Sequence, residues 1–234
     1  SSLLLLSDFF FRTSKSKKYE EIRFTLPSGT PLVAKLKITS GNQRKLPVIF
    51  LFGGFEEAGQ VLELIQSPVP AIIVSFDYPF HAPRKLRFPQ SLGLLSDAKA
   101  AVLDTLSGIP LLLDKILERK DVDPKRITLI GASFGAPFAV YSASKDARFS
   151  GLVVVHGFGK IKEVIEHRLK MSLEKKYGSF LSSFFSWVIS RLCWNYLGID
   201  EVETAASRIQ ASQKVFMVSA RDDSFIPNSA KESL

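Results

Sequence analysis

A serine between two glycines is the first group in this sequence that could carry catalytic chemistry. The stretch ITLIGASFGAPFAVY, residues 127–141, joins an apolar run to a run of small residues, and its centre, residues 131–135, has the form G-x-S-x-G. This spacing is typical of a sharp strand-to-helix turn that raises a serine hydroxyl above a sheet and directs the following N–H groups toward one point. Ser133 is therefore a candidate nucleophile for acyl transfer, and it would need a base, an orienting acid and an oxyanion site.

The elements that would position these groups alternate between strand and helix. Two strand-like runs joined by Pro27-Ser28-Gly29 predict a hairpin near the beginning of the chain. Five further runs are apolar on both faces, which predicts strands covered on both sides in a mostly parallel sheet: 46–52, 71–76, 126–130, 151–155 and 214–219. Helix-like segments lie between them at 56–66, about 97–120 and 136–144. The pattern predicts an α/β fold with its site at the carboxyl ends of the strands.

One connection interrupts this alternation. From about residue 158 to 213 the chain leaves the sheet, first with helical spacing of apolar residues and then with FLSSFFSWVISRLCWNYLGI, in which Arg191 is the only charge. We interpret this insertion as a helical cap over the strand ends. A patch that docks on a membrane is the alternative interpretation of its aromatic residues.

The residues around Ser133 resemble a known architecture. DVDPKRITLIGASFGAPFA, residues 121–139, resembles the nucleophile elbow of the α/β-hydrolase fold, especially its esterase, dienelactone-hydrolase and serine-peptidase-like branches. The resemblance extends from about residue 20 to the end of the chain. It implies hydrolysis through an acyl-enzyme without a metal or an organic cofactor.

The resemblance also implies an oxyanion site made of two backbone N–H groups. One belongs to Phe134, directly after the serine, and the other comes from the loop after the third strand, FLFGGFEEAG. By position that second donor is Gly54 or, as a less favoured choice, Phe55. Many relatives carry His-Gly where this chain has Phe52-Gly53, and a plain Gly-Gly turn is the structural alternative.

Two further motifs supply an acid and a histidine. In VFMVSARDDSFIP the acid of the family pattern falls on Asp223, four residues before Pro227, with Asp222 as the neighbour that a shift in register would select. A polar turn is the alternative interpretation of this Asp-Asp-Ser run. In DYPFHAPR, His81 falls on a histidine that is structural in the family.

The general base is the member that the motifs do not supply. The resemblance implies the order serine, acid, histidine, yet all three histidines, His81, His156 and His167, precede Asp223. A chain that starts without Met and stops within a helix-like turn favours a fragment whose histidine lies further on. His156, at the end of the strand next to the elbow strand, is the resident alternative. A pseudoenzyme is the third possibility.

Composition and charge argue against several other classes of function. The chain has 234 residues, 46% of them apolar, and a net charge of +8 without a nucleic-acid motif, so we expect no nucleic-acid partner. The single cysteine, Cys193, excludes a Cys-based zinc site and an internal disulfide, and its aromatic context indicates a core thiol. An apolar and basic segment at 1–18 precedes the hydrolase-like domain of 19–234. We expect a cytoplasmic protein, associated with a membrane if that segment is the remnant of an anchor.

The sequence therefore predicts a capped α/β-hydrolase that cleaves a carboxylic ester, favoured because the cap is rich in aromatic residues. An ester with an apolar acyl or alcohol part is the expected small-molecule substrate. The alternatives are a peptidase of the same fold and a binding or membrane-peripheral module without catalysis.

Overall fold

A computed structural model describes most of the chain after residue 18. The described residues are 19–39, 45–54, 58–63, 65, 70–79, 94–219 and 227–234. The N-terminal segment 1–18 lies outside this set. So do four residues that the sequence singles out, Phe55, His81, Asp222 and Asp223.

Among the described residues, seven strands form one sheet with the order β1-β2-β4-β3-β5-β6-β7. Their bounds are β1 Glu20–Thr25, β2 Pro31–Ile38, β3 Leu46–Phe52, β4 Ile72–Phe76, β5 Val122–Ala132, β6 Gly151–Val155 and β7 Lys214–Val218. β2 pairs antiparallel with both β1 and β4, and all other pairs are parallel. The predicted hairpin and the predicted mostly parallel sheet are confirmed.

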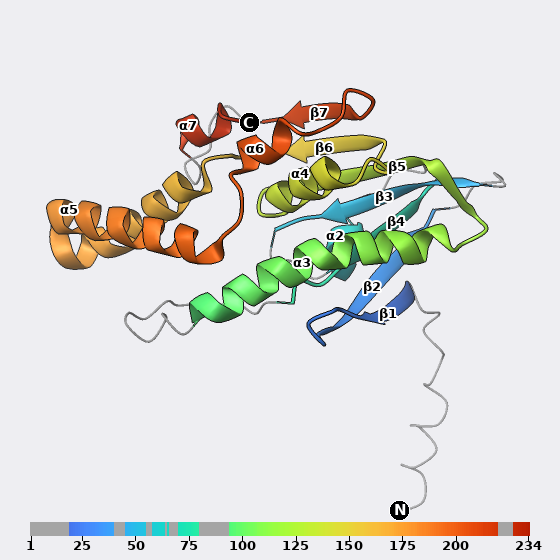
Figure 1. The fold of residues 1–234 in the computed structure, drawn as a ribbon, viewed down its shortest axis with the longest axis horizontal. Coiled ribbons are helices and arrows are strands. Elements are labelled where there is room, and N and C mark those ends of the chain that lie inside the picture. Colours follow the sequence, from blue (N-terminus) through green and yellow to red (C-terminus); the bar gives the residue numbers. More distant parts are fainter. Residues whose placement is uncertain are drawn as a thin grey trace, which may run out of the picture.

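Six helices accompany the sheet in the described parts of the chain. They are α2 Ala58–Glu63, α3 Leu94–Leu117, α4 Gly135–Lys145, α5 Ile161–Leu197, α6 Val202–Ala206 and α7 Asn228–Lys231. Helices α3 and α4 pack on one face of the sheet, and α2 packs on the other (Figure 1). The helix predicted at about 97–120 is observed as α3, and the one predicted after the serine is observed as α4.

The apolar runs become the core because strands of a parallel sheet are covered on both faces. In β4 every side chain from Ile72 to Phe76 is buried. Helix α4 is equally enclosed, since all its residues from Gly135 to Ala143 are buried. A helix at the centre of the core holds the residues before it in a fixed place, and those residues include Ser133.

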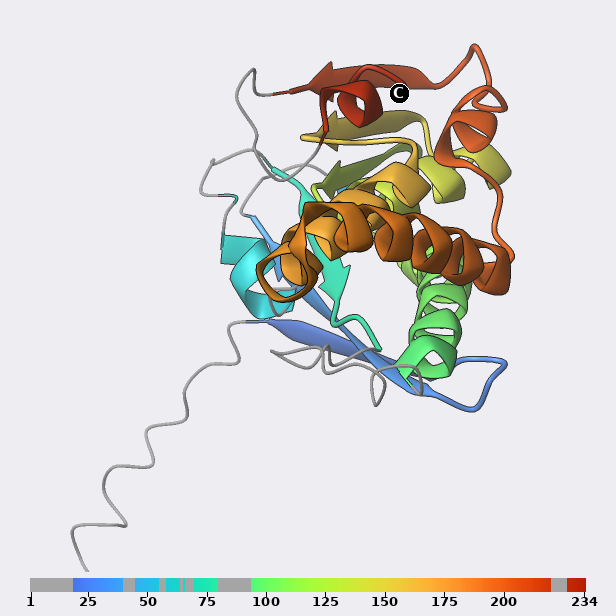
Figure 2. The ribbon, with the colours of Figure 1, turned by 90° about the vertical axis from the view of Figure 1, so that its left-hand side faces the viewer.

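The insertion between β6 and β7 is helical, as predicted. It consists of α5 and α6, and α5 projects from the side of the sheet at which the parallel strands end (Figures 1 and 2). Its aromatic residues are mostly exposed, so they do not pack in a core. The exposed fractions are 86% for Phe180, 57% for Phe184, 42% for Phe185 and 48% for Trp187, whereas Trp194 is buried. The interpretation of the insertion as a cap stays a prediction.

Candidate active site

The turn that carries Ser133 connects β5 to α4. Ser133 is exposed and has φ 51°, in the left-handed region that residues other than glycine rarely adopt. Its N–H donates to the carbonyl oxygen of Val155 at 2.9 Å, and its own carbonyl accepts from the N–H of Ala136 at 3.0 Å. These two bonds tie the strained residue to β6 and to α4. Strain held in this way at an exposed serine is a feature of functional turns.

The two glycines of the motif allow this turn because they have no Cβ. At either position a Cβ would collide with atoms of the neighbouring segments. A Cβ on Gly131 would lie 2.6 Å from Cβ of Ala139 and 2.7 Å from the carbonyl oxygen of Gly135. A Cβ on Gly135 would meet the carbonyl oxygen of Phe52 and would lie 2.8 Å from that of Gly53. Gly135 therefore presses the elbow against the end of β3, where the predicted oxyanion loop begins.

The two predicted oxyanion donors belong to adjacent segments. Phe134 precedes the first residue of α4 and has helical backbone angles, so its N–H lies at the start of a helix. Gly54 is half-buried and follows β3, one residue after the Gly53 carbonyl that lies against Gly135.

Two residues after β4 hold this loop at both of its ends, and sequence reasoning missed them. The Tyr78 hydroxyl donates to the carbonyl oxygen of Gly53 at 2.9 Å. Oδ1 of Asp77 accepts the N–H of Ala58, the first residue of α2, at 2.6 Å. In DYPFHAPR the family pattern drew attention to His81. The signal for Asp77 and Tyr78 was their position directly after a strand, where the polar residues of a site in an α/β fold are expected.

Tyr78 also contacts two phenylalanine rings that follow Ser133 in the sequence. Its ring centroid lies 5.4 Å from that of Phe134 and 5.6 Å from that of Phe138. The rings of Phe134 and Phe138 are themselves 5.4 Å apart, in an edge-to-face arrangement. This aromatic cluster joins the elbow, the start of α4 and the end of β4 in one packed unit.

The hydroxyl of Tyr78 is expected to act as a positioning group. Tyr78→Phe keeps the ring contacts but removes the bond to Gly53. For the ester hydrolysis that the sequence predicts, we expect kcat to fall about tenfold with little change in KM, because the oxyanion of that reaction forms only in the transition state. Tyr19→Phe is the matched control, since the Tyr19 hydroxyl donates to another backbone carbonyl, that of Gly59 in α2, at 3.1 Å. Equal losses in the two variants would contradict the proposed role of Tyr78.

His156 lies beside the elbow. In the parallel pair of β5 and β6, Ala132 lies opposite Val155. Ser133 and His156 are the residues that directly follow these two strands. His156 is exposed and has φ 49°, and its N–H donates to the carbonyl oxygen of Val218 at 2.7 Å. His167, by contrast, is half-buried in α5.

The segment predicted to carry the acid begins at the same edge of the sheet. β7 lies next to β6, with Val218 opposite Val155, so the chain that leads to Asp222 and Asp223 starts beside His156. Within the described residues, no cluster of three or more His, Cys, Asp or Glu side chains could hold a metal ion. The thiol of Cys193 is half-buried, and burial raises its pKa, which disfavours the reactive thiolate.

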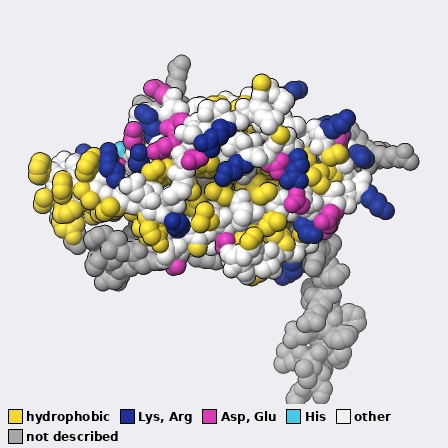
Figure 3. All heavy atoms as spheres, viewed as in Figure 1, with side chains coloured by type: hydrophobic (Ala, Val, Ile, Leu, Met, Phe, Trp, Pro, Cys, Tyr) yellow, Lys and Arg dark blue, Asp and Glu magenta, His cyan; other side chains and the backbone are white. Residues whose placement is uncertain are grey.

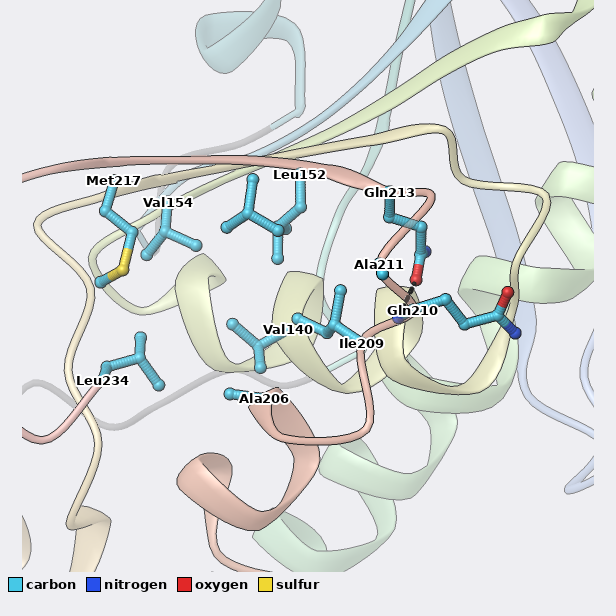
Figure 4. A pocket seen from close by; sticks show the side chains of 11 residues that line it. Val140, Leu152, Val154, Ala206, Ile209, Gln210, Ala211, Gln213, Met217 and Leu234 are labelled. Atoms are coloured by element: carbon cyan, nitrogen blue, oxygen red, sulfur yellow. Dashed lines mark hydrogen bonds between the residues drawn. The ribbon is translucent and has the colours of Figure 1, made fainter.

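A pocket of about 320 Å³ lies elsewhere, on the α4 side of β6 and β7 (Figure 4). Its lining is mostly apolar and comes from α4, the two strands, the chain after α6 and the last residue, Leu234. Of the predicted site residues that the structure describes, namely Gly54, Ser133, Phe134 and His156, none lines it. The lining is therefore distinct from these four residues.

Comparison with solved structures places this geometry in a known architecture. The structure resembles acetyl xylan esterase 1 from Thermoanaerobacterium sp. JW/SL YS485, with a TM-score of 0.60 and 17% identity over 92% of this chain and 81% of that one. It resembles an acetyl xylan esterase from Paenibacillus sp. R4 with a TM-score of 0.59 and 17% identity, over 88% and 70% of the two chains. It also resembles an esterase from Pyrococcus furiosus, with a TM-score of 0.55 and 15% identity over 92% of this chain and 76% of that one.

The chain has the α/β-hydrolase fold, as its sequence motifs indicated. No protein-family profile matches the sequence, and no curated protein resembles it at a significant level. At identities below a fifth, the similarity concerns the fold, and the chemistry has to be argued from the residues of this chain.

Proposed function

We propose that this protein is a serine hydrolase that cleaves carboxylic esters through an acyl-enzyme on Ser133. The observation that carries the proposal is the exposed Ser133 at φ 51°, held between β5 and α4 by glycines that no larger residue could replace without a clash. Strain of this kind is expected where a side chain must be presented to a substrate. The esterases among the similar structures support the same reaction class.

The proposed reaction has two halves. Oγ of Ser133 attacks the ester carbonyl carbon while its proton passes to a base, and the N–H groups of Phe134 and Gly54 hold the oxyanion. The C–O bond to the alcohol then breaks, and the base returns the proton to the leaving oxygen. Water repeats the sequence on the acyl-enzyme and releases the acid. Phe55 is the less favoured donor.

Asp223, or Asp222 if the register is shifted, is proposed to orient the base. Two positions for that base can be distinguished by experiment: His156, and a histidine that follows the acid in the full-length protein. His156→Gln would abolish hydrolysis in the first case and would leave most of it in the second. Register supports the first position, since His156 follows the residue opposite Ala132, whereas the order serine, acid, histidine supports the second.

The substrate is proposed to carry an apolar acyl or alcohol part. The aromatic cluster of Tyr78, Phe134 and Phe138, which adjoins the elbow, supports this preference because such rings bind apolar groups. Short peptides are the alternative substrate for the same chemistry. The cytoplasmic location stays a prediction.

A fluorophosphonate probe tests the proposal directly, because it reacts only with an activated serine. The full-length protein should be labelled, and peptide mapping should place the label on Ser133. Labelling that persists in Ser133→Ala would assign the reactive serine elsewhere. A folded protein that takes up no label at all would favour the alternative of a binding module without catalysis.

A further inference from the structure

Helix α5 is a hairpin of two helical halves. The backbone at Gly178 has φ 74° and ψ 170°, which is not helical, so the element from Ile161 to Leu197 divides into halves at 161–177 and 179–197. An ion pair of 3.1 Å between Nη1 of Arg191 and Oε2 of Glu166 joins the halves, which therefore lie side by side. The hairpin projects away from the sheet (Figures 1 and 2).

The second half of the hairpin carries small polar residues on its inner face. Ser182, Ser186 and Ser190 recur every four residues, so they share one face of the helix, and all three are fully buried. Each hydroxyl donates to a carbonyl oxygen one turn earlier, at 2.9, 3.1 and 3.1 Å respectively. The serines can therefore be buried without another polar partner, and their small volume lets a neighbouring helix approach closely.

Large apolar residues occupy the outside of the hairpin instead. We call Tyr177, Phe180, Leu181, Phe184, Phe185 and Trp187 the aromatic tip, and each is at least 42% exposed. The ring centroids of Tyr177 and Phe185 lie 6.3 Å apart, and those of Phe184 and Phe185 lie 5.8 Å apart. Figure 3 shows apolar side chains gathered at the end of α5.

This distribution is the reverse of that in a helix of a water-soluble domain, whose apolar stripe faces the core. Small residues at the contact between helices and large apolar residues outside are typical of helices that lipid surrounds. Within the described parts of the chain, no helix combines the length and the hydropathy that crossing a bilayer would require. A hairpin of this kind would enter the interface of a bilayer without spanning it.

Charge favours an anionic bilayer. The chain has a net charge of +8. Close to the aromatic tip, the guanidinium carbon of Arg191 lies 4.3 Å from the ring centroid of Trp187. Arg168, on the first half of the hairpin, is exposed. Over residues 161–197 the sequence has six Lys or Arg and three Asp or Glu. Aromatic rings on a segment with this excess of positive charge match the acyl chains and the anionic headgroups of a membrane interface.

We propose that the aromatic tip of α5 docks this protein on an anionic lipid bilayer by inserting into its interface. A second copy of the chain is the less suitable occupant, because a standard protein interface takes about 20–30 residues from each partner, whereas the described part of α5 exposes nine large apolar residues in all. The proposal does not depend on the chemistry of Ser133.

Flotation with large unilamellar vesicles tests this surface. The full-length protein should float with vesicles of phosphatidylcholine and phosphatidylglycerol in a 70:30 ratio, and less with phosphatidylcholine alone or at high salt. Phe180→Ser combined with Phe184→Ser should weaken binding at least about tenfold. Leu103→Ser is the matched control, since Leu103 is 47% exposed on α3, outside the hairpin, and this variant should bind like the unaltered protein.

Tryptophan fluorescence gives an independent measurement, because the chain has only two tryptophans. In Trp194→Phe the remaining Trp187 should shift to the blue and be quenched by brominated lipids when vesicles are added, whereas Trp187→Phe should show neither change. Vesicle binding that the Phe180 and Phe184 changes leave intact would overturn the proposal. Dimerisation without vesicle binding, abolished by the same changes, would overturn it in favour of a second copy.

Discussion

Ser133→Gly is expected to be inactive and more stable than the unaltered protein. The change removes the proposed nucleophile, so hydrolysis of an activated ester should fall by a factor of about 10⁴ or more. It also relieves the left-handed backbone at φ 51°, which is costly for serine and nearly free for glycine. After the greater entropy of glycine in the unfolded chain is subtracted, we expect a gain of about 1 kcal/mol in the free energy of unfolding.

Ser133→Ala separates the two effects. Alanine also lacks the hydroxyl but keeps a Cβ, so this variant should be as inactive as Ser133→Gly without its added stability. Thermal unfolding of the three proteins measures the difference, which should appear as a rise of about 2–4 °C in the Tm of the glycine variant alone. A glycine variant that melts with or below the alanine variant would show that the turn stores no strain.

Gly135→Ala is expected to damage both the fold and the site. The added Cβ would meet the carbonyl oxygen of Phe52 and would lie 2.6 Å from the carbonyl carbon of the same residue. These are backbone atoms of a central strand, so no change of rotamer can relieve the contact. We expect a loss of about 3 kcal/mol or more in the free energy of unfolding, because overpacking that moves backbone is at the upper end of its range.

Activity should fall further than the loss of folded protein explains, because the displaced end of β3 leads directly to Gly54. The measurements are urea unfolding and ester hydrolysis per folded molecule. Gly59→Ala, the same change in α2, is the matched control, since its Cβ would meet only side-chain atoms, the closest at 3.6 Å. Similar behaviour of the two variants would contradict the importance of the contact between the elbow and β3.

The elbow could be predicted from the sequence because its determinants are local. An apolar strand, two glycines at fixed spacing and a run of small residues specify a turn within fifteen residues, and the structure contains that turn as β5, Ser133 and α4. The alternation of runs likewise predicted the parallel sheet, since burial on both faces leaves a direct mark on composition.

The hydrogen bond by which Tyr78 holds the predicted oxyanion loop could not be predicted in the same way. The proposed role of Tyr78 depends on one bond from its hydroxyl to a backbone carbonyl 25 residues earlier, directly after a neighbouring strand. Any residue contributes such a carbonyl, so the partner leaves no trace in the sequence. Only the position of a polar residue at the end of a strand was visible.

Hydropathy also did not predict which face of α5 is buried. In an aromatic helix that contains serines, the larger residues are normally assigned to the interior. Here the serines satisfy their hydroxyls within the helix, which removes the usual cost of burying them, and the rings point outward. Which face turns inward was thus decided by side-chain volume at the contact between two helical halves.

The pairing of β3 with β5 determines when the turn at Ser133 can form during folding. Ile49 lies opposite Thr128, and Gly135 lies against Phe52, so the turn at Ser133 is closed by residues about eighty positions earlier. Parallel pairing over such a separation forms slowly, since a long loop must be closed first. We therefore expect a nascent or partly folded chain to carry an ordinary, relaxed serine, and the proposed nucleophile to form only when the centre of the sheet is complete.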